Sequence, residues 1–140
     1  MKREIISPLL SITSNLLLPL LIIFSIYLLL RGHNMPGGGF VGGLVAASAF
    51  TLYLIASGVE AAKKKLRFDP RNIILSGLSV MLASGLIGLV MGHSFLKGLW
   101  FETEVPVIGK IGTPLIFDIG VYFVVCGITL SIIFSLAEDD

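Results

Sequence analysis

The chain has 140 residues, of which 55% are hydrophobic and 14% charged, and its formal net charge is +1. Together with a mean hydropathy of +0.97, this composition excludes an ordinary soluble domain built around one buried core. Four apolar runs reach the roughly 20 residues that a helix needs to cross a bilayer, at about residues 8–30, 39–61, 72–91 and 115–137. We therefore predict an all-α integral membrane protein with four transmembrane helices, forming a single domain over residues 1–140 within the lipid bilayer.

Positive residues are distributed unevenly over the ends and loops of this four-helix topology. The start of the chain imitates a signal peptide, but its apolar run is too long and lacks a small-residue cleavage site, so we expect it to be retained. Cytoplasmic loops of membrane proteins carry an excess of Lys and Arg, which predicts that both termini are cytoplasmic. On that side lie Lys2, Arg3, Lys63, Lys64, Lys65, Arg67 and Arg71, against Arg31, Lys97 and Lys110 on the other.

The first apolar run carries polar residues at three-to-four spacing, namely Ser7, Ser11, Ser14 and Asn15. This spacing gathers them on one stripe of a helix, which we expect to face protein. Two interpretations stay open: hydrogen bonds between helices that hold the bundle together, or a polar path for ions.

A joint rich in glycine, from Arg31 to Gly43, connects the first two runs. Lipid-exposed backbone must satisfy its own hydrogen bonds, so a joint with so few side chains requires covering protein, which indicates an assembled complex. Beyond it, small residues recur every four positions in two rows, and such rows favour close helix packing. A phosphate cradle is disfavoured because the joint lacks the Lys-Ser/Thr ending of a P-loop. The rows are Gly38, Gly42 and Ala46, and Gly39, Gly43 and Ala47.

The basic segment from Glu60 to Arg71 separates the second and third runs. Glu60 and Lys64 are spaced to pair over one helical turn, and Asp69 before Pro70 is typical of an N-cap followed by proline at the first helical position. The cluster sets topology and is also suited to anionic lipid headgroups. It does not resemble a nucleic-acid surface.

The third run contains Gly77, Gly85, Gly88 and Gly92, which again favours close packing over exposure to lipid. Residues 93–114 that follow include Trp100 and two acidic residues and are typical of an extracytoplasmic loop at the lipid interface. Within this loop we expect a short hairpin over 105–111.

Asp118 is the one acidic residue that the sequence places inside a predicted span, and an intramembrane carboxylate is by default a candidate functional group. If Pro114 is the first helical residue, Asp118 lies only about 6 Å along the axis from the helix start. Helix N-termini favour anions, so a structural anion and a place in an ion or proton route are both open. His33 lies on the same side and is suited to a proton relay, pH sensing or plain loop packing. No metal site, cofactor or catalytic group is expected.

Two segments resemble the signatures of the MrpB/MnhB family of small membrane subunits. They are Gly32-His-Asn-Met-Pro-Gly-Gly-Gly-Phe-Val-Gly-Gly43 and Gly112-Thr-Pro-Leu-Ile-Phe-Asp-Ile-Gly-Val-Tyr122. The resemblance spans essentially the whole chain and implies four helices. Its motif positions here are His33, Pro36, Gly37, Gly38, Gly39, Phe40, Gly42, Gly43, Pro114, Phe117, Asp118 and Gly120.

The resemblance implies a subunit of the Mrp-type Na+/H+ antiporter of the bacterial cell membrane, which exchanges cytoplasmic sodium for external protons. The implied partners are the large, proton-channel-like A and D subunits and the small C, E, F and G subunits. The same resemblance also allows a place in the membrane arm of a related ion-translocating hydrogenase.

Three roles follow as hypotheses. The chain is a non-catalytic subunit whose glycine joint and Asp118 line part of an ion pathway, or a purely structural subunit, or a self-sufficient carrier. The third is disfavoured, because carriers bind their ions near the bilayer midplane and the sequence offers no ionisable residue there.

Overall fold

The computed structural model describes residues 8–31, 38–90, 100–105 and 109–139. The elements in chain order are α1 (Pro8–Arg31), α2 (Gly39–Ser57), α3 (Val59–Leu66), α4 (Pro70–Val90), β1 (Trp100–Val105), β2 (Gly109–Gly112) and α5 (Thr113–Asp139). Among the described residues, four helical stretches are long and apolar enough to cross a membrane, as predicted. They correspond to α1, to α2, to α3 together with most of α4, and to α5.

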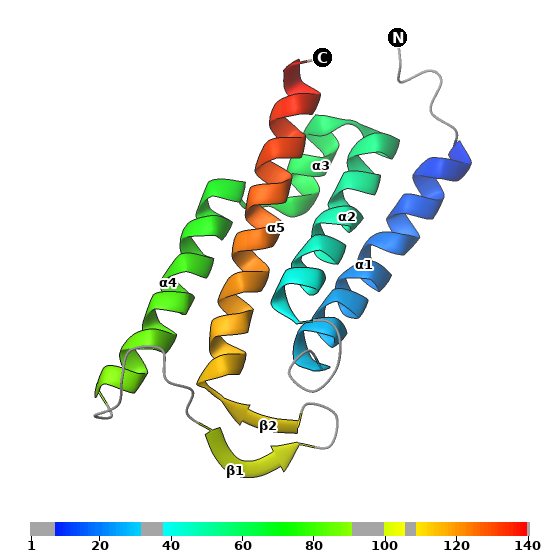
Figure 1. Cartoon of the computed structure of the whole chain (residues 1–140). Helices are drawn as coiled ribbons and strands as arrows, with labels where there is room; N and C mark the ends of the chain where they lie inside the picture. Colours follow the sequence, from blue (N-terminus) through cyan, green and yellow to red (C-terminus); the bar gives the residue numbers. More distant parts are fainter. Residues whose placement is uncertain (1–7, 32–37, 91–99, 106–108, 140) are drawn as a thin grey trace.

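The spanning helices lie side by side in the order α1, α2, α5, α4, so that α2 and α5 form the middle (Figure 1). α2 packs on α1 and on α5, and α4 packs on the other side of α5. The arrangement is closer to a single layer than to a closed bundle. Its core is therefore small and lies mainly along the α2–α5 contact, where Ala46, Ala47, Cys126 and Leu130 are buried.

The second helix is shorter than the predicted run of 39–61. It ends at Ser57 because Gly58 adopts φ +94°, a left-handed conformation that glycine adopts without steric cost, and donates its N–H to the Leu54 carbonyl at 2.8 Å. The chain then continues as the short basic helix α3.

The predicted N-cap of the third span, Asp69 followed by Pro70 as the first helical residue, is confirmed. Asp69 Oδ1 accepts the backbone N–H of Arg71 at 3.0 Å, and the Asp69 carbonyl accepts the N–H of Asn72 at 2.9 Å. The ion pair found in this region joins Lys63 to Glu138 at the end of α5, whereas the sequence suggested Glu60 with Lys64.

The start of α1, the end of α5 and α3 all lie at one end of the layer, and the β-hairpin lies at the other (Figure 1). Which end is cytoplasmic stays a prediction. β1 and β2 pair antiparallel, with Trp100 opposite Gly112 and Val105 opposite Gly109, and the register is irregular between Trp100 and Glu104. The hairpin expected at 105–111 is therefore present, but its first strand starts five residues earlier, at Trp100.

Candidate functional site

The two small-residue rows of α2 bring this helix unusually close to both neighbours. A Cβ atom on Gly39 would lie 2.2 Å from the backbone oxygen of Asp118, and one on Gly43 would lie 2.8 Å from that of Tyr122. On the other side, a Cβ on Gly42 would lie 2.8 Å from the Ser25 carbonyl oxygen of α1. Real Cβ atoms essentially never approach below 3.0 Å, so α2 lies closer to both neighbours than side chains at these positions would allow.

The carboxylate of Asp118 lies against the first residues of α2. A Cβ on Gly38 would be 3.0 Å from Asp118 Oδ2, and one on Gly39 would be 2.6 Å from Oδ1. Gly38 has φ +95° and donates its N–H to the Leu28 carbonyl at 2.9 Å, which ties the start of α2 to the end of α1. Asp118 is half-buried at the meeting point of three helices.

The start of a helix carries partial positive charge, because its first N–H groups have no carbonyl partner within the helix. Here the N-cap is Gly38, which has no side chain with which to cap α2. The Asp118 carboxylate, supplied by α5, therefore lies where a negative charge is most favourable. The glycines at 38 and 39 are what leave room for it.

A buried hydrogen bond lies beside this junction. Ser25 Oγ on α1 and Tyr122 Oη on α5 are 2.6 Å apart, and Ser25 Oγ donates to the Ile22 carbonyl at 2.6 Å. Since a serine hydroxyl carries one proton, the tyrosine hydroxyl is the donor in this pair. The Tyr122 ring passes over Gly42, where a Cβ would be 3.1 Å from Cδ2, so this glycine lets α5 reach α1.

The Ser25–Tyr122 pair was not predicted from the sequence. A signal for it exists, since Ser25 follows Ser14 by about three helical turns and so shares its face. Both serines are buried, with 1% of Ser14 and none of Ser25 exposed.

Two residues of the predicted polar stripe of α1 form hydrogen bonds within their own helix, and Ser7 lies outside the described residues. Ser14 Oγ and Asn15 Nδ2 both donate to the Ser11 carbonyl of their own helix, at 2.9 Å each, and Asn15 is exposed. Near the opposite end of α1, Ser25 Oγ accepts a hydrogen bond from Tyr122 Oη of α5.

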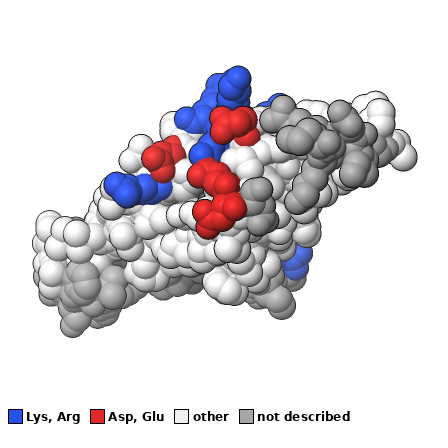
Figure 2. Space-filling view, turned by 90° about the horizontal axis from the view of Figure 1, so that it is seen from above, with Lys and Arg blue, Asp and Glu red and all other residues white. Residues whose placement is uncertain are grey.

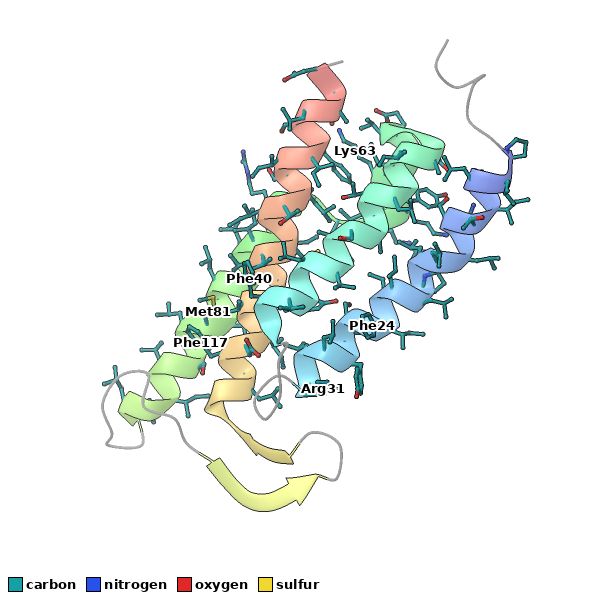
Figure 3. The ribbon with its side chains drawn as sticks, turned by 45° about the vertical axis from the view of Figure 1, so that its right-hand side comes forward. Phe24, Arg31, Phe40, Lys63, Met81 and Phe117 are labelled. Carbon is teal, nitrogen blue, oxygen red and sulfur yellow. The ribbon has the colours of Figure 1, made fainter. Side chains whose placement is uncertain are left out.

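Glycines also face each other between α4 and α5. A Cβ on Gly77 would lie 2.6 Å from the Gly120 carbonyl oxygen, and one on Gly120 would lie 2.7 Å from that of Gly77. Met81 of α4 lies in the same contact, and Figure 3 labels this residue. A Cβ atom on Gly120 would be 2.4 Å from Met81 Cγ. Gly120 thus lies where α4 and α5 approach most closely.

The structure describes the remaining predicted site residues only in part. His33, Pro36 and Gly37 lie outside the described residues, as does His93, and the side chain of Pro114 is not described. Phe40 is 59% exposed on the surface of α2, and Phe117 is half-buried on α5 (Figure 3).

Comparisons with known proteins agree on one family. A domain family described as related to the MnhB subunit of the Na+/H+ antiporter matches residues 9–131. The B-type Na(+)/H(+) antiporter subunit of Alkalihalophilus pseudofirmus is 41% identical over 86% of this chain and 85% of its own length, and its Bacillus subtilis counterpart is 38% identical over 86% of both chains. A putative antiporter subunit, mnhB2, of Staphylococcus aureus is 33% identical over 89% of both.

Among solved structures, the Mrp complex from Dietzia sp. DQ12-45-1b contains a chain that matches with a TM-score of 0.78 and 33% identity. The match covers 96% of this chain but 15% of the matched one, so the same fold occurs there as a small part of a much longer polypeptide. Family match, sequence identity and fold all agree with four helices suited to a membrane. The chain is therefore a multi-pass membrane protein that belongs to the MnhB family of Na+/H+ antiporter subunits.

Proposed function

We propose that this chain is a small B-type subunit of an Mrp-type Na+/H+ antiporter, and that its Asp118 site takes part in the ion pathway of that complex. Relatives that are 33–41% identical are named as antiporter subunits, and the fold matches part of an Mrp complex. The other Mrp subunits, large A and D and small C, E, F and G, are its partners. The chain carries out no bond chemistry of its own.

The open arrangement of the helices supports a place among other subunits. Because the four spans form a layer, large apolar side chains stay uncovered along the outer helices and on the faces of the middle ones. Leu16 and Leu20 of α1 are 65% and 59% exposed, Leu82 of α4 is 56% exposed and Ile132 of α5 is 56% exposed. Lipid and neighbouring membrane proteins are the environments in which such surfaces are stable.

The position of Asp118 is the observation that carries the proposed role in transport. It lies in the first turns of α5, at the end of the layer that bears the hairpin, and so near the end of the span and not at its middle. The carboxylate lies against the start of α2, whose first N–H groups have no carbonyl partner within the helix. A carboxylate held in this way can attract a cation into the complex and release it, since the helix dipole offsets part of its charge.

The alternative is a purely structural role, in which the same carboxylate only joins α2 to α5. The close contacts between Asp118 and Gly38 and Gly39 support this structural role, because they hold α5 against the start of α2. The two roles differ in one respect: a structural anion is needed for assembly but not for turnover.

The test is an exchange of Asp118 for Asn and for Ala in the complete complex, in a host that lacks its own antiporters. Asn keeps the size and the hydrogen-bonding oxygen but removes the charge. Sodium-dependent proton release from everted membrane vesicles measures transport, and copurification of the other subunits through a tag on this chain measures assembly.

We expect Asp118→Asn to assemble normally and to lose most of its antiport activity. Asn variants that assemble and transport like the wild type would overturn the pathway role and leave the structural one. Ser48→Ala is the control, because Ser48 lies on the exposed face of α2 and its hydroxyl bonds only the Leu44 carbonyl of its own helix.

A further inference from the structure

A polar pocket lies at the other end of the molecule from Asp118. Its volume is about 530 Å³, and it is bounded by α3, the turn between α3 and α4, and the last turns of α5. Looking down on this end, Figure 2 shows Lys and Arg gathered beside Asp and Glu over the middle of the molecule. Its size lies within the range of roughly 300–1,000 Å³ typical of small-molecule sites.

Three cationic side chains line the pocket, and their partners differ. Lys63 is paired with Glu138, which closes one side. Arg67 and Arg71 also line it, and among the described residues neither side chain forms an ion pair. The second acidic residue, Asp69, is engaged by the backbone N–H of Arg71 as the cap of α4. The two arginines therefore retain their donors for an external anion.

Arg67 is held in a backbone conformation that disfavours its side chain. It caps the C-terminal end of α3 with φ 72°, in the left-handed region. No other non-glycine residue among those that the structure describes has a positive φ. Glycine is the usual residue at this position of a helix end. An arginine that persists there suggests that its side chain has a function of its own.

The wall formed by α5 offers hydroxyl donors and an apolar base. Ser131, Phe134, Ser135 and Glu138 recur at helical spacing and face the pocket together. None of the hydrogen bonds found among the described residues uses the hydroxyl of Ser131 or Ser135. Phe68 lines the opposite rim and is 67% exposed, a position suited to contact with lipid at the membrane surface.

We propose that this pocket binds the phosphate headgroup of an anionic phospholipid. Arg67 and Arg71 bind the phosphate oxygens, since a guanidinium matches a phosphate with paired N–H donors. Ser131 and Ser135 donate further hydrogen bonds, and Phe68 contacts the start of the acyl chains. A lipid is favoured over a soluble phosphate because the pocket lies at the end of four spanning helices and combines cations with an exposed ring. This site is independent of the role proposed for Asp118.

Photocrosslinking from the pocket rim tests the proposal in the assembled complex. Benzoylphenylalanine replaces Phe68, and the complex is reconstituted in vesicles of phosphatidylglycerol mixed with phosphatidylcholine. After irradiation, the mass of this chain identifies the lipid attached to it. We expect phosphatidylglycerol to be enriched about tenfold over its share of the bilayer, as two cations at a membrane surface allow.

The variant Arg67→Gly with Arg71→Gln should reduce this enrichment to the bulk share of the lipid. Arg67→Gly alone relieves the unfavourable φ, so a partial loss in this folded variant assigns the effect to the side chain. Lys64→Gln is the matched control, because it removes one charge from the same helix outside the pocket and should leave the enrichment unchanged.

Three results would overturn the proposal. An equal loss of lipid enrichment in Lys64→Gln would show that diffuse electrostatic attraction, and not this pocket, holds the lipid. Crosslinks to another protein of the complex in place of lipid would show that protein covers the pocket. Displacement of the lipid by excess soluble glycerol phosphate would reassign the site to a soluble ligand.

Discussion

Gly39→Ala tests the close approach of α2 and α5 most sharply. The new methyl group would lie 2.2 Å from the backbone oxygen of Asp118, against a limit of 3.0 Å, so the helices must separate locally by at least 3.0 − 2.2 = 0.8 Å. The side-chain oxygen Oδ1 at 2.6 Å adds a second clash. A backbone atom cannot rotate away, so we expect a cost near the upper end of the about 1–3 kcal/mol typical of overpacking.

The assay is the thermal stability of the purified complex, followed through a fluorescent tag on this chain by size-exclusion chromatography after heating. Gly39→Ala should melt clearly below the wild type, and antiport should fall in parallel because the Asp118 site is displaced. Ser48→Ala, on the exposed face of the same helix, should stay within about 0.5 kcal/mol of the wild type. A Gly39→Ala complex that melts with the wild type would refute the close packing on which the site depends.

The remaining expectations concern three other contacts. Ser25→Ala should lower the free energy of unfolding by about 1–3 kcal/mol, because it leaves the buried Tyr122 hydroxyl without its acceptor. Tyr122→Phe should lower it by only about 0.6 kcal/mol. Equal losses of the two variants in chemical denaturation would argue against Tyr122 as the donor. Gly77→Ala should separate α4 from α5, because its methyl group would lie 2.6 Å from the Gly120 carbonyl oxygen. Disulfide formation between cysteines placed along the two helices should then become slower. An unchanged rate would contradict this contact. Asp69→Ala should destabilise the start of α4 by about 1 kcal/mol, seen as faster amide exchange there, and Asp69→Asn should largely retain the cap.

Much of the fold was predictable because its determinants are local. Apolar runs of membrane length set the number of spans, and Asp69 before Pro70 marked the start of α4. The end of α2 was missed because Gly58 lies inside an apolar run, where only its positive φ shows that the helix stops. Repeated glycines indicated close contact, but their spacing does not name the partner helix.

The candidate site was predicted only in part for the same reason. A lone acidic residue in a span pointed to Asp118, but its neighbour, the start of α2, depends on the lateral order of the helices. The partner of Ser25 lies 97 residues away in the chain, and a sequence offers no local signal for such a pair. The pocket beside α3 likewise requires the end of α5 to lie over the α3–α4 turn.

Membership of an Mrp-type antiporter can be tested most directly by purifying this chain from its native membrane through a tag, in mild detergent, and identifying the proteins that accompany it. We expect the large and small subunits of an Mrp-type antiporter in fixed proportion. Subunits of a hydrogenase in their place would assign the chain to a different complex, and a homo-oligomer free of other subunits would show that it is not an antiporter subunit.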